Sequence, residues 1–225
     1  MQKRKKSKLS KKIFCFFNMN KILTITFLSF FFCGNLYAEK IPRSYNGTAL
    51  SVEGIFLGDS LLNYFSEEEI KEKVSKTKNN YKSKEYLRFT FKVKNPKNFK
   101  YVGIHFKNNK SYEIGSLAGT LFYYKDMKPC SENERIVVDN LKKQHKNARI
   151  VGSPNTKHII PRDKSGKSTF TYTKFVLDKI PVNIVVTCTT LGEQYKKQYK
   201  KRDTFKLAMQ TDHLVKWLGT KAKGR

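Results

Sequence analysis

Alternation between apolar and polar side chains constrains the fold of this 225-residue chain more than any other feature. Residues 86–93 alternate as a half-buried strand does, and an Asn/Pro turn separates them from a second run at residues 101–106. Residues 112–124 are apolar enough for a third strand, in which Gly115 and Gly119 favour a bulge or close packing. The three segments together predict an antiparallel meander.

A second group of strands is predicted toward the C-terminus, at residues 169–177, 182–191 and 205–211. Residues 152–166 are predicted to form a loop, and residues 193–202 a basic connector. The predicted fold class is therefore α+β. It has an antiparallel sheet of about five to six strands in two meanders, with helices packed on one face.

Two helices are predicted from their start signals. Ser66, with Glu69 three residues on, forms a capping box for a short helix. The same spacing recurs at Ser131 and Glu134, which are expected to begin a helix that runs to His145.

The first 38 residues have the pattern of a secretory signal peptide with a basic extension in front. Residues 22–32 form an uncharged apolar stretch after Lys21, and a cleavage site follows Ala38. The stretch is shorter than the roughly 20 residues of a membrane-spanning helix, so an uncleaved anchor is the less favoured alternative. Because the chain from Met19 onward already satisfies the signal pattern, translation is expected to start there; the other interpretation is a genuine basic tail.

After this leader, residues 39–52 are expected to be a flexible lead-in, and residues 53–225 a single α+β domain. Cleavage near Ala38 would make the domain periplasmic or secreted, in an oxidising compartment. Two of the four cysteines belong to the leader, and the remaining pair, Cys130 and Cys188, is predicted to form a disulfide.

Basic residues dominate the charge of the chain. The formal charge is +28, and removal of the leader leaves 38 basic against 18 acidic residues, a charge of +20. This balance favours a polyanion or an anionic membrane surface as partner, although a merely solvated basic surface is the simpler interpretation. Only eight of the 46 basic residues are Arg, so sequence-specific recognition of nucleic acid is not expected. The candidate polyanion contact is a segment that concentrates charge beside two tyrosines: Tyr195, Lys196, Lys197, Tyr199, Lys200, Lys201 and Arg202.

No motif in the sequence predicts catalysis or metal binding. The four His residues are isolated, and no GxSxG, HExxH or phosphate-binding loop occurs. We therefore assign no catalytic residue, cofactor or metal ligand. The letters GDSL at residues 58–61 spell the name of a lipase family, but Asp212 and His213 are adjacent rather than spaced as that family requires. A hydrolase that uses Ser60 is accordingly the least favoured hypothesis.

Four segments, at residues 55–70, 116–141, 182–188 and 203–218, resemble small exported proteins of AT-rich marine alphaproteobacteria. That family carries no assigned activity. With the leader and the missing catalytic motifs, the resemblance leads us to expect a non-enzymatic periplasmic or secreted domain that binds another envelope component. A binder of polyanions or of anionic membrane surfaces is the alternative.

Overall fold

The computed structural model describes residues 43–45, 47–78, 81–123 and 127–222. The leader predicted at residues 1–38 lies outside the described residues, as does the beginning of the lead-in. Within the described part of the chain, no helix is long and apolar enough to cross a membrane.

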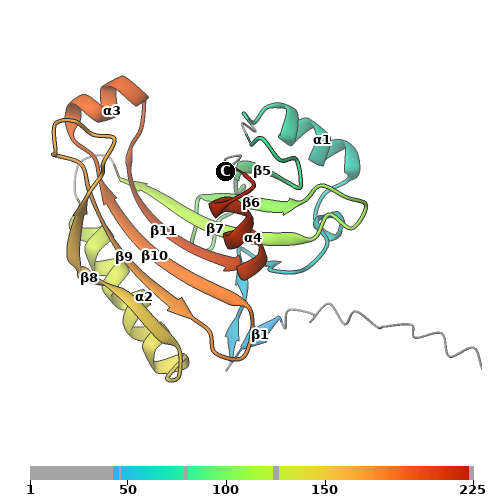
Figure 1. Ribbon diagram of the computed structural model, residues 1–225, viewed down its shortest axis with the longest axis horizontal. Helices are drawn as coiled ribbons and strands as arrows, with labels where there is room; N and C mark the ends of the chain where they lie inside the picture. The colour runs from blue at the N-terminus through green and yellow to red at the C-terminus, as the bar shows by residue number, and fades with distance from the viewer. Residues whose placement is uncertain (1–42, 46, 79–80, 124–126, 223–225) are drawn as a thin grey trace, which may run out of the picture. The chain divides into compact units, whose positions relative to one another are not determined.

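One seven-stranded antiparallel sheet organises the fold, in the order β5-β6-β7-β11-β10-β9-β8 (Figure 1). The α+β class and the antiparallel sheet are confirmed, but the predicted number of strands was too low. The seven strands are β5 (Tyr86–Lys92), β6 (Tyr101–Lys107), β7 (Ile114–Tyr123), β8 (Arg149–Ile159), β9 (Thr169–Val176), β10 (Val182–Thr190) and β11 (Asp203–Thr211).

The strand that the sequence failed to indicate is β8, which occupies much of the segment expected to be a loop. It pairs with β9 alone, at one edge of the sheet. Its register shifts between Ser153 and His158, and Gly152 has a φ of +83°. Pro154, which lacks a backbone N–H, lies inside this irregularity. An edge strand tolerates both features because one of its sides needs no hydrogen-bonding partner.

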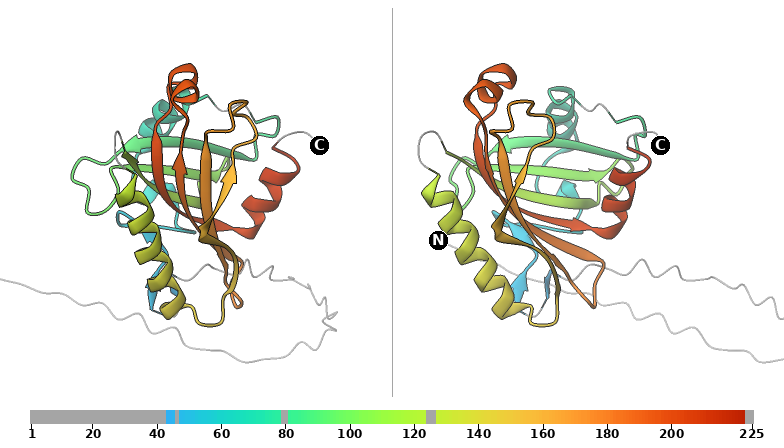
Figure 2. Two further views of the ribbon diagram at one scale, coloured as in Figure 1. Left: turned by 90° about the vertical axis from the view of Figure 1, so that its left-hand side faces the viewer. Right: turned by 60° about the vertical axis from the view of Figure 1, so that its left-hand side comes forward.

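The main core lies on one face of the sheet, under helix α2 (Lys128–Gln144). Figure 2 shows α2 running alongside the sheet. Strand residues that point toward α2, among them Phe175, Val186 and Phe205, are buried. The predicted disulfide is confirmed: Cys130 of α2 is bonded to Cys188 of β10, with 5.9 Å between their Cα atoms. We call this side of the sheet the core face.

Helix α2 begins three residues earlier than predicted. Met127 is the N-cap residue and makes no side-chain cap hydrogen bond, and Pro129 stands in the first turn, where a missing N–H costs nothing. The capping box predicted at Ser131 and Glu134 is therefore wrong. Glu134 points into the core instead, where its carboxylate accepts a hydrogen bond from the Thr171 hydroxyl.

Short N-terminal elements cover the rest of the core face. The capping box of Ser66 and Glu69 is confirmed at the start of α1. Residues 44–45, 48–49 and 51–52, part of the expected flexible lead-in, form short strands, and Leu50 and Val52 are apolar and buried in the core. The elements are β1 (Ser44–Tyr45), β2 (Thr48–Ala49), β3 (Ser51–Val52), β4 (Ile55–Phe56), the 3-10 helix η1 (Leu61–Asn63) and α1 (Glu67–Ser75).

The last two helices lie on the other side of the sheet, contrary to the expectation that all helices share one face. Helix α4 (Asp212–Gly219) packs Trp217 against Tyr86, which alternation along β5 places on the face opposite Phe89 and the main core. Helix α3 (Glu193–Tyr199) forms where a basic connector was predicted. Because α3 precedes β11 and α4 follows it, the two helices stand at opposite ends of the central strand (Figure 1).

Candidate functional site

Between α3 and α4, the second face of the sheet has no layer of secondary structure over it among the described residues. We call it the open face. Side chains alternate between the two faces along each strand, so every second strand residue belongs to the open face. The strand register aligns these residues in rows across the sheet. One row crosses from the first edge strand to the last: Lys92, Tyr101, Thr120, Lys206, Thr187, Tyr172 and Ser153.

The neighbouring row is built from small side chains. It contains Gly103, Ala118 and Ala208 on the three middle strands β6, β7 and β11. A side chain at Gly103 would approach the Thr90 hydroxyl to 3.3 Å. These residues project little, and Ala118 and Ala208 are buried among the larger side chains around them.

The charged residues that the strands contribute to the open face are all basic, although Glu113, just before β7, forms an ion pair with Lys107 at 2.7 Å. In the seven strands, all of them described, Asp203 is the one acidic residue, and it belongs to the core face. There its carboxylate accepts a hydrogen bond from the backbone N–H of Leu191 at 2.7 Å and pairs with Lys196 at 2.7 Å. The basic strand residues of the open face are Arg88, Lys92, Lys107, Arg149, Lys174 and Lys206.

Lys206 occupies the centre of this face, on the middle strand β11. Its side chain is exposed to solvent, yet desolvation by the surrounding protein lowers its pKa, and the positive charge of Arg88 lowers it further. The two observations agree if the ammonium group stands in a hollow, where solvent enters but protein atoms surround it on most sides. An anion bound beside Lys206 would offset the charge of Arg88 and compensate for the hydration that Lys206 has lost.

His105 shares the open face with Arg88 and Lys206. Burial lowers its pKa to about 4, and the charges of those two residues act in the same direction. Its Nε2 lies 2.9 Å from the hydroxyl of Tyr81. At neutral pH the imidazole is therefore uncharged and held in place, so it is a hydrogen-bonding group and not a cation.

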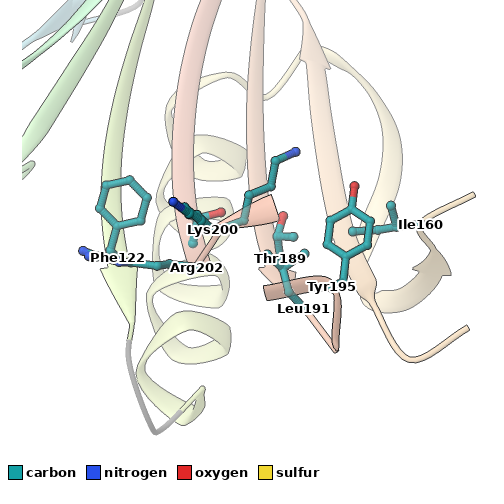
Figure 3. Close-up of a pocket in the computed structure, with 9 residues that line it drawn as sticks. Phe122, Ile160, Thr189, Leu191, Tyr195, Lys200 and Arg202 are labelled. Carbon is teal, nitrogen blue, oxygen red and sulfur yellow. The ribbon is translucent and has the colours of Figure 1, made fainter. Parts of the chain in front are cut away.

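A pocket of about 530 Å³ lies at the α3 end of the open face (Figure 3). Three strands contribute open-face residues to it, and α3 with the segment that follows supplies the rest. We call it the α3 pocket. Its lining consists of Phe122, Ile160, Thr189, Leu191, Tyr195, Lys200, Lys201, Arg202 and Thr204.

Four of the seven residues predicted as a polyanion contact line this pocket: Tyr195, Lys200, Lys201 and Arg202. Lys200 ends α3 in a left-handed conformation with a φ of 50°, which turns the chain back toward β11. The ammonium group of Lys201 lies 5.6 Å from the ring centroid of Tyr195, and the guanidinium of Arg202 lies 6.0 Å from that of Phe122.

The other three predicted residues are placed differently. Lys196 forms ion pairs with Asp203 and Glu193, and these hydrogen bonds raise its pKa. Lys197 is exposed on α3. The ring of Tyr199 packs against that of Tyr195, with 4.5 Å between centroids, and faces a smaller neighbouring pocket.

The hydroxyl of Ser60 caps the 3-10 helix η1. It accepts a hydrogen bond from the backbone N–H of Leu62 at 3.3 Å and donates one to the carbonyl of Ser111 at 2.8 Å. Both partners are backbone groups. Among the residues that the structure describes, no three His, Cys, Asp or Glu side chains are grouped to hold a metal ion.

The sequence prediction missed the central residues of the open face, namely Arg88, His105 and Lys206. A signal for Lys206 was present, because it interrupts the apolar residues of a predicted strand and so faces away from Phe205 and Leu207. What could not be read from the sequence is the strand order, which puts Arg88 of β5 and Lys206 of β11 on one face, near enough for the charge of Arg88 to act on Lys206.

Comparisons with protein-family models, with curated proteins and with solved structures find no match to this chain.

Proposed function

We propose that this protein is an exported, non-enzymatic domain that binds an anionic component of the cell envelope through its open face. One observation carries the proposal: Lys92, Lys174 and Lys206 lie on a face to which the strands contribute no acidic residue, and Lys206 at its centre is partly desolvated. An acidic polysaccharide or an anionic lipid surface has the complementary charge. Export and kinship with small exported proteins are part of the proposal.

The electrostatics of Lys206 favour this function over a merely solvated basic surface. A lysine on an ordinary surface keeps its full hydration and loses little when it stands alone. Lys206 has given up part of its hydration, and Arg88 lies close enough to oppose its charge. Binding of an anion would compensate both costs, because it supplies the opposite charge where water is already partly displaced.

The open face suits a polyanion better than a specific base sequence. Lysine carries a compact charge without the planar fork by which arginine recognises guanine edges, and lysines are four of the six basic strand residues of this face. Each bound anionic group releases counterions, so affinity would fall steeply with salt and depend little on sequence.

The experiment measures retention on immobilised heparin and on phosphatidylglycerol vesicles as sodium chloride is increased. We expect the double variant Lys206→Gln and Lys174→Gln to lose about tenfold in affinity and to show a shallower salt dependence. The matched control is Lys142→Gln with Lys143→Gln, which removes the same charge from exposed positions of α2. Equal losses in the two double variants would mean that net charge, and not the open face, causes retention.

A further inference from the structure

We propose that the α3 pocket binds one molecule of a phosphate-bearing amphiphile. The phosphate would lie at the basic rim of the pocket, and the hydrocarbon chain would cover the apolar floor of the pocket. This inference rests on the proposed function, because the pocket is one end of the open face. The charge of the open face alone does not specify the chemical class of this ligand.

The basic rim consists of three consecutive residues, Lys200, Lys201 and Arg202, all exposed. Figure 3 shows Lys200 and Arg202 on the same side as Phe122, at the strand ends. The left-handed turn at Lys200 ends α3, and the next two side chains lie beside Tyr195 (Lys201) and Phe122 (Arg202). Such a cluster suits a phosphate, whose oxygens accept several charged hydrogen bonds at once.

Two carboxylates near the rim are paired with a lysine of α3. Glu193 and Asp203 form ion pairs with Lys196, at 2.9 and 2.7 Å. Lys196 is not among the residues that line the pocket.

The floor of the pocket is apolar, with two aliphatic and two aromatic side chains. Leu191 and Tyr195 are each 6% exposed, and Ile160 and Phe122 are half-buried beside them. The volume of about 530 Å³ lies inside the usual range of ligand pockets, about 300–1,000 Å³. A purely ionic ligand such as free phosphate would leave this apolar surface in contact with water, whereas a hydrocarbon chain would cover it.

The aromatic rings of the pocket are poorly placed to stack on nucleobases. Phe122 has the edge-on ring of Tyr101 at 4.9 Å and the Arg202 guanidinium near one face. Tyr195 packs on Tyr199 and carries Lys201 near its ring. Single-strand binders need open aromatic faces for successive bases, so the observations favour an aliphatic chain.

Isothermal titration calorimetry with four probes tests the proposal: dodecyl phosphate below its micelle concentration, inorganic phosphate, dodecyl maltoside and a twelve-residue oligothymidine. We expect dodecyl phosphate to bind at least tenfold more tightly than each of the other three. Shortening its chain from twelve to eight carbons should weaken binding by roughly twofold or more for each methylene. Equal binding of inorganic phosphate, or tighter binding of the oligothymidine, would overturn the proposal.

Two variants test the basic rim and the apolar floor of the pocket separately. Lys201→Gln with Arg202→Gln should reduce dodecyl phosphate affinity at least tenfold, and Ile160→Asn should abolish the dependence on chain length. Lys142→Gln with Lys143→Gln on α2 is the control and should bind like the wild type. If either pocket variant unfolds, the chain-length series on the wild-type protein decides alone, since it requires no substitution.

Failure of this inference can be told apart from failure of the proposed function. If heparin retention depends on Lys206 and Lys174 while dodecyl phosphate and inorganic phosphate bind alike, the open face binds polyanions and the amphiphile assignment is wrong. If retention does not depend on Lys206 and Lys174, the proposed function fails, whatever the pocket binds.

Discussion

The two faces of the sheet are made by alternate residues of the same seven strands, yet they differ in almost every property. On the core face, Phe175, Ile184 and Val186 are fully buried under α2. On the open face, their sequence neighbours Lys174, Val185 and Thr187 are half-buried, with no element packed over them. Buried and solvent-facing side chains are thus separated in this fold by a period of two residues, so either face can change without the other.

The same separation explains where charge is placed. The acidic strand residue Asp203 and its partner Lys196 satisfy one another on the core side, so they contribute to the fold and not to binding. The basic residues of the open face have no such function in the core. Changes on the core face should therefore affect unfolding, and changes on the open face should affect ligand retention.

The largest expected effect tests this separation directly, by comparing Phe175→Ala on the core face with Tyr172→Ala on the open face of the same strand. Phe175→Ala should lower the free energy of unfolding by about 3–5 kcal/mol, because it leaves a cavity where a ring is now 0% exposed. Tyr172→Ala should cost about 1 kcal/mol or less. Urea unfolding followed by circular dichroism gives both values. Similar losses of stability in the two variants would contradict the assignment of stability to the core face.

The next effect concerns the disulfide that joins α2 to the core face. Replacement of Cys130 and Cys188 by Ala should lower the free energy of unfolding by about 3–4 kcal/mol, because the bond closes a loop with a sequence separation of 58 residues. Heparin retention of the protein that stays folded should not change. A loss of retention without a loss of stability would show that the two faces are coupled.

The smallest effect comes from His105 on the open face. Its folded pKa of about 4 lies below the ordinary value of 6.5, so the unfolded chain binds more protons between these values. Its contribution to stability is therefore complete above pH 6.5 and is lost as the pH falls toward 4, on the order of 2 kcal/mol after allowance for solvent. His105→Gln should remove that part of the pH dependence.

Urea unfolding of wild type and His105→Gln at pH 7 and at pH 4.5 measures this difference. Burial also lowers the pKa of His145, on the core side, so acid destabilises both proteins to some extent. The residual loss in the variant is the contribution of His145 and the carboxylates. Parallel pH profiles for the two proteins would exclude the assigned role of His105.

Local patterns predicted most of the sheet because its strands alternate strongly. Strands β5, β6, β9 and β10 begin and end within about a residue of their predicted limits. Gly115 lies at the register shift of β7, next to Tyr86, and Gly119 lies beneath the ring of Phe99, as a bulge or close packing requires.

The errors arose where tertiary contacts overrode local signals. β8 carries Gly152 and Pro154, which favour a loop, and it is a strand because β9 offers it an edge to pair with. Glu134 has the spacing of a capping residue, but α2 starts earlier and turns it toward Thr171. The sequence pattern does not contain the position of either partner.

For the candidate site, the sequence predicted residues at the α3 end of the open face but not the residues at its centre. The concentration of charge from Tyr195 to Arg202 was visible in the chain, and four of those residues line the α3 pocket. The surroundings of Lys206 were not visible. They include the row of Gly103, Ala118 and Ala208, in which β11 lies beside β7 although the two strands are far apart in the sequence.

The sequence by itself determined the class of the fold, the antiparallel meanders and the pair of cysteines, because strand periodicity and cysteine number are local or compositional properties. The tertiary structure alone decided which face is left open, that its charged strand residues are all basic, and that Lys206 is partly desolvated. The physical reason is that these properties depend on strand order and register. Both are fixed by contacts between residues far apart in the chain.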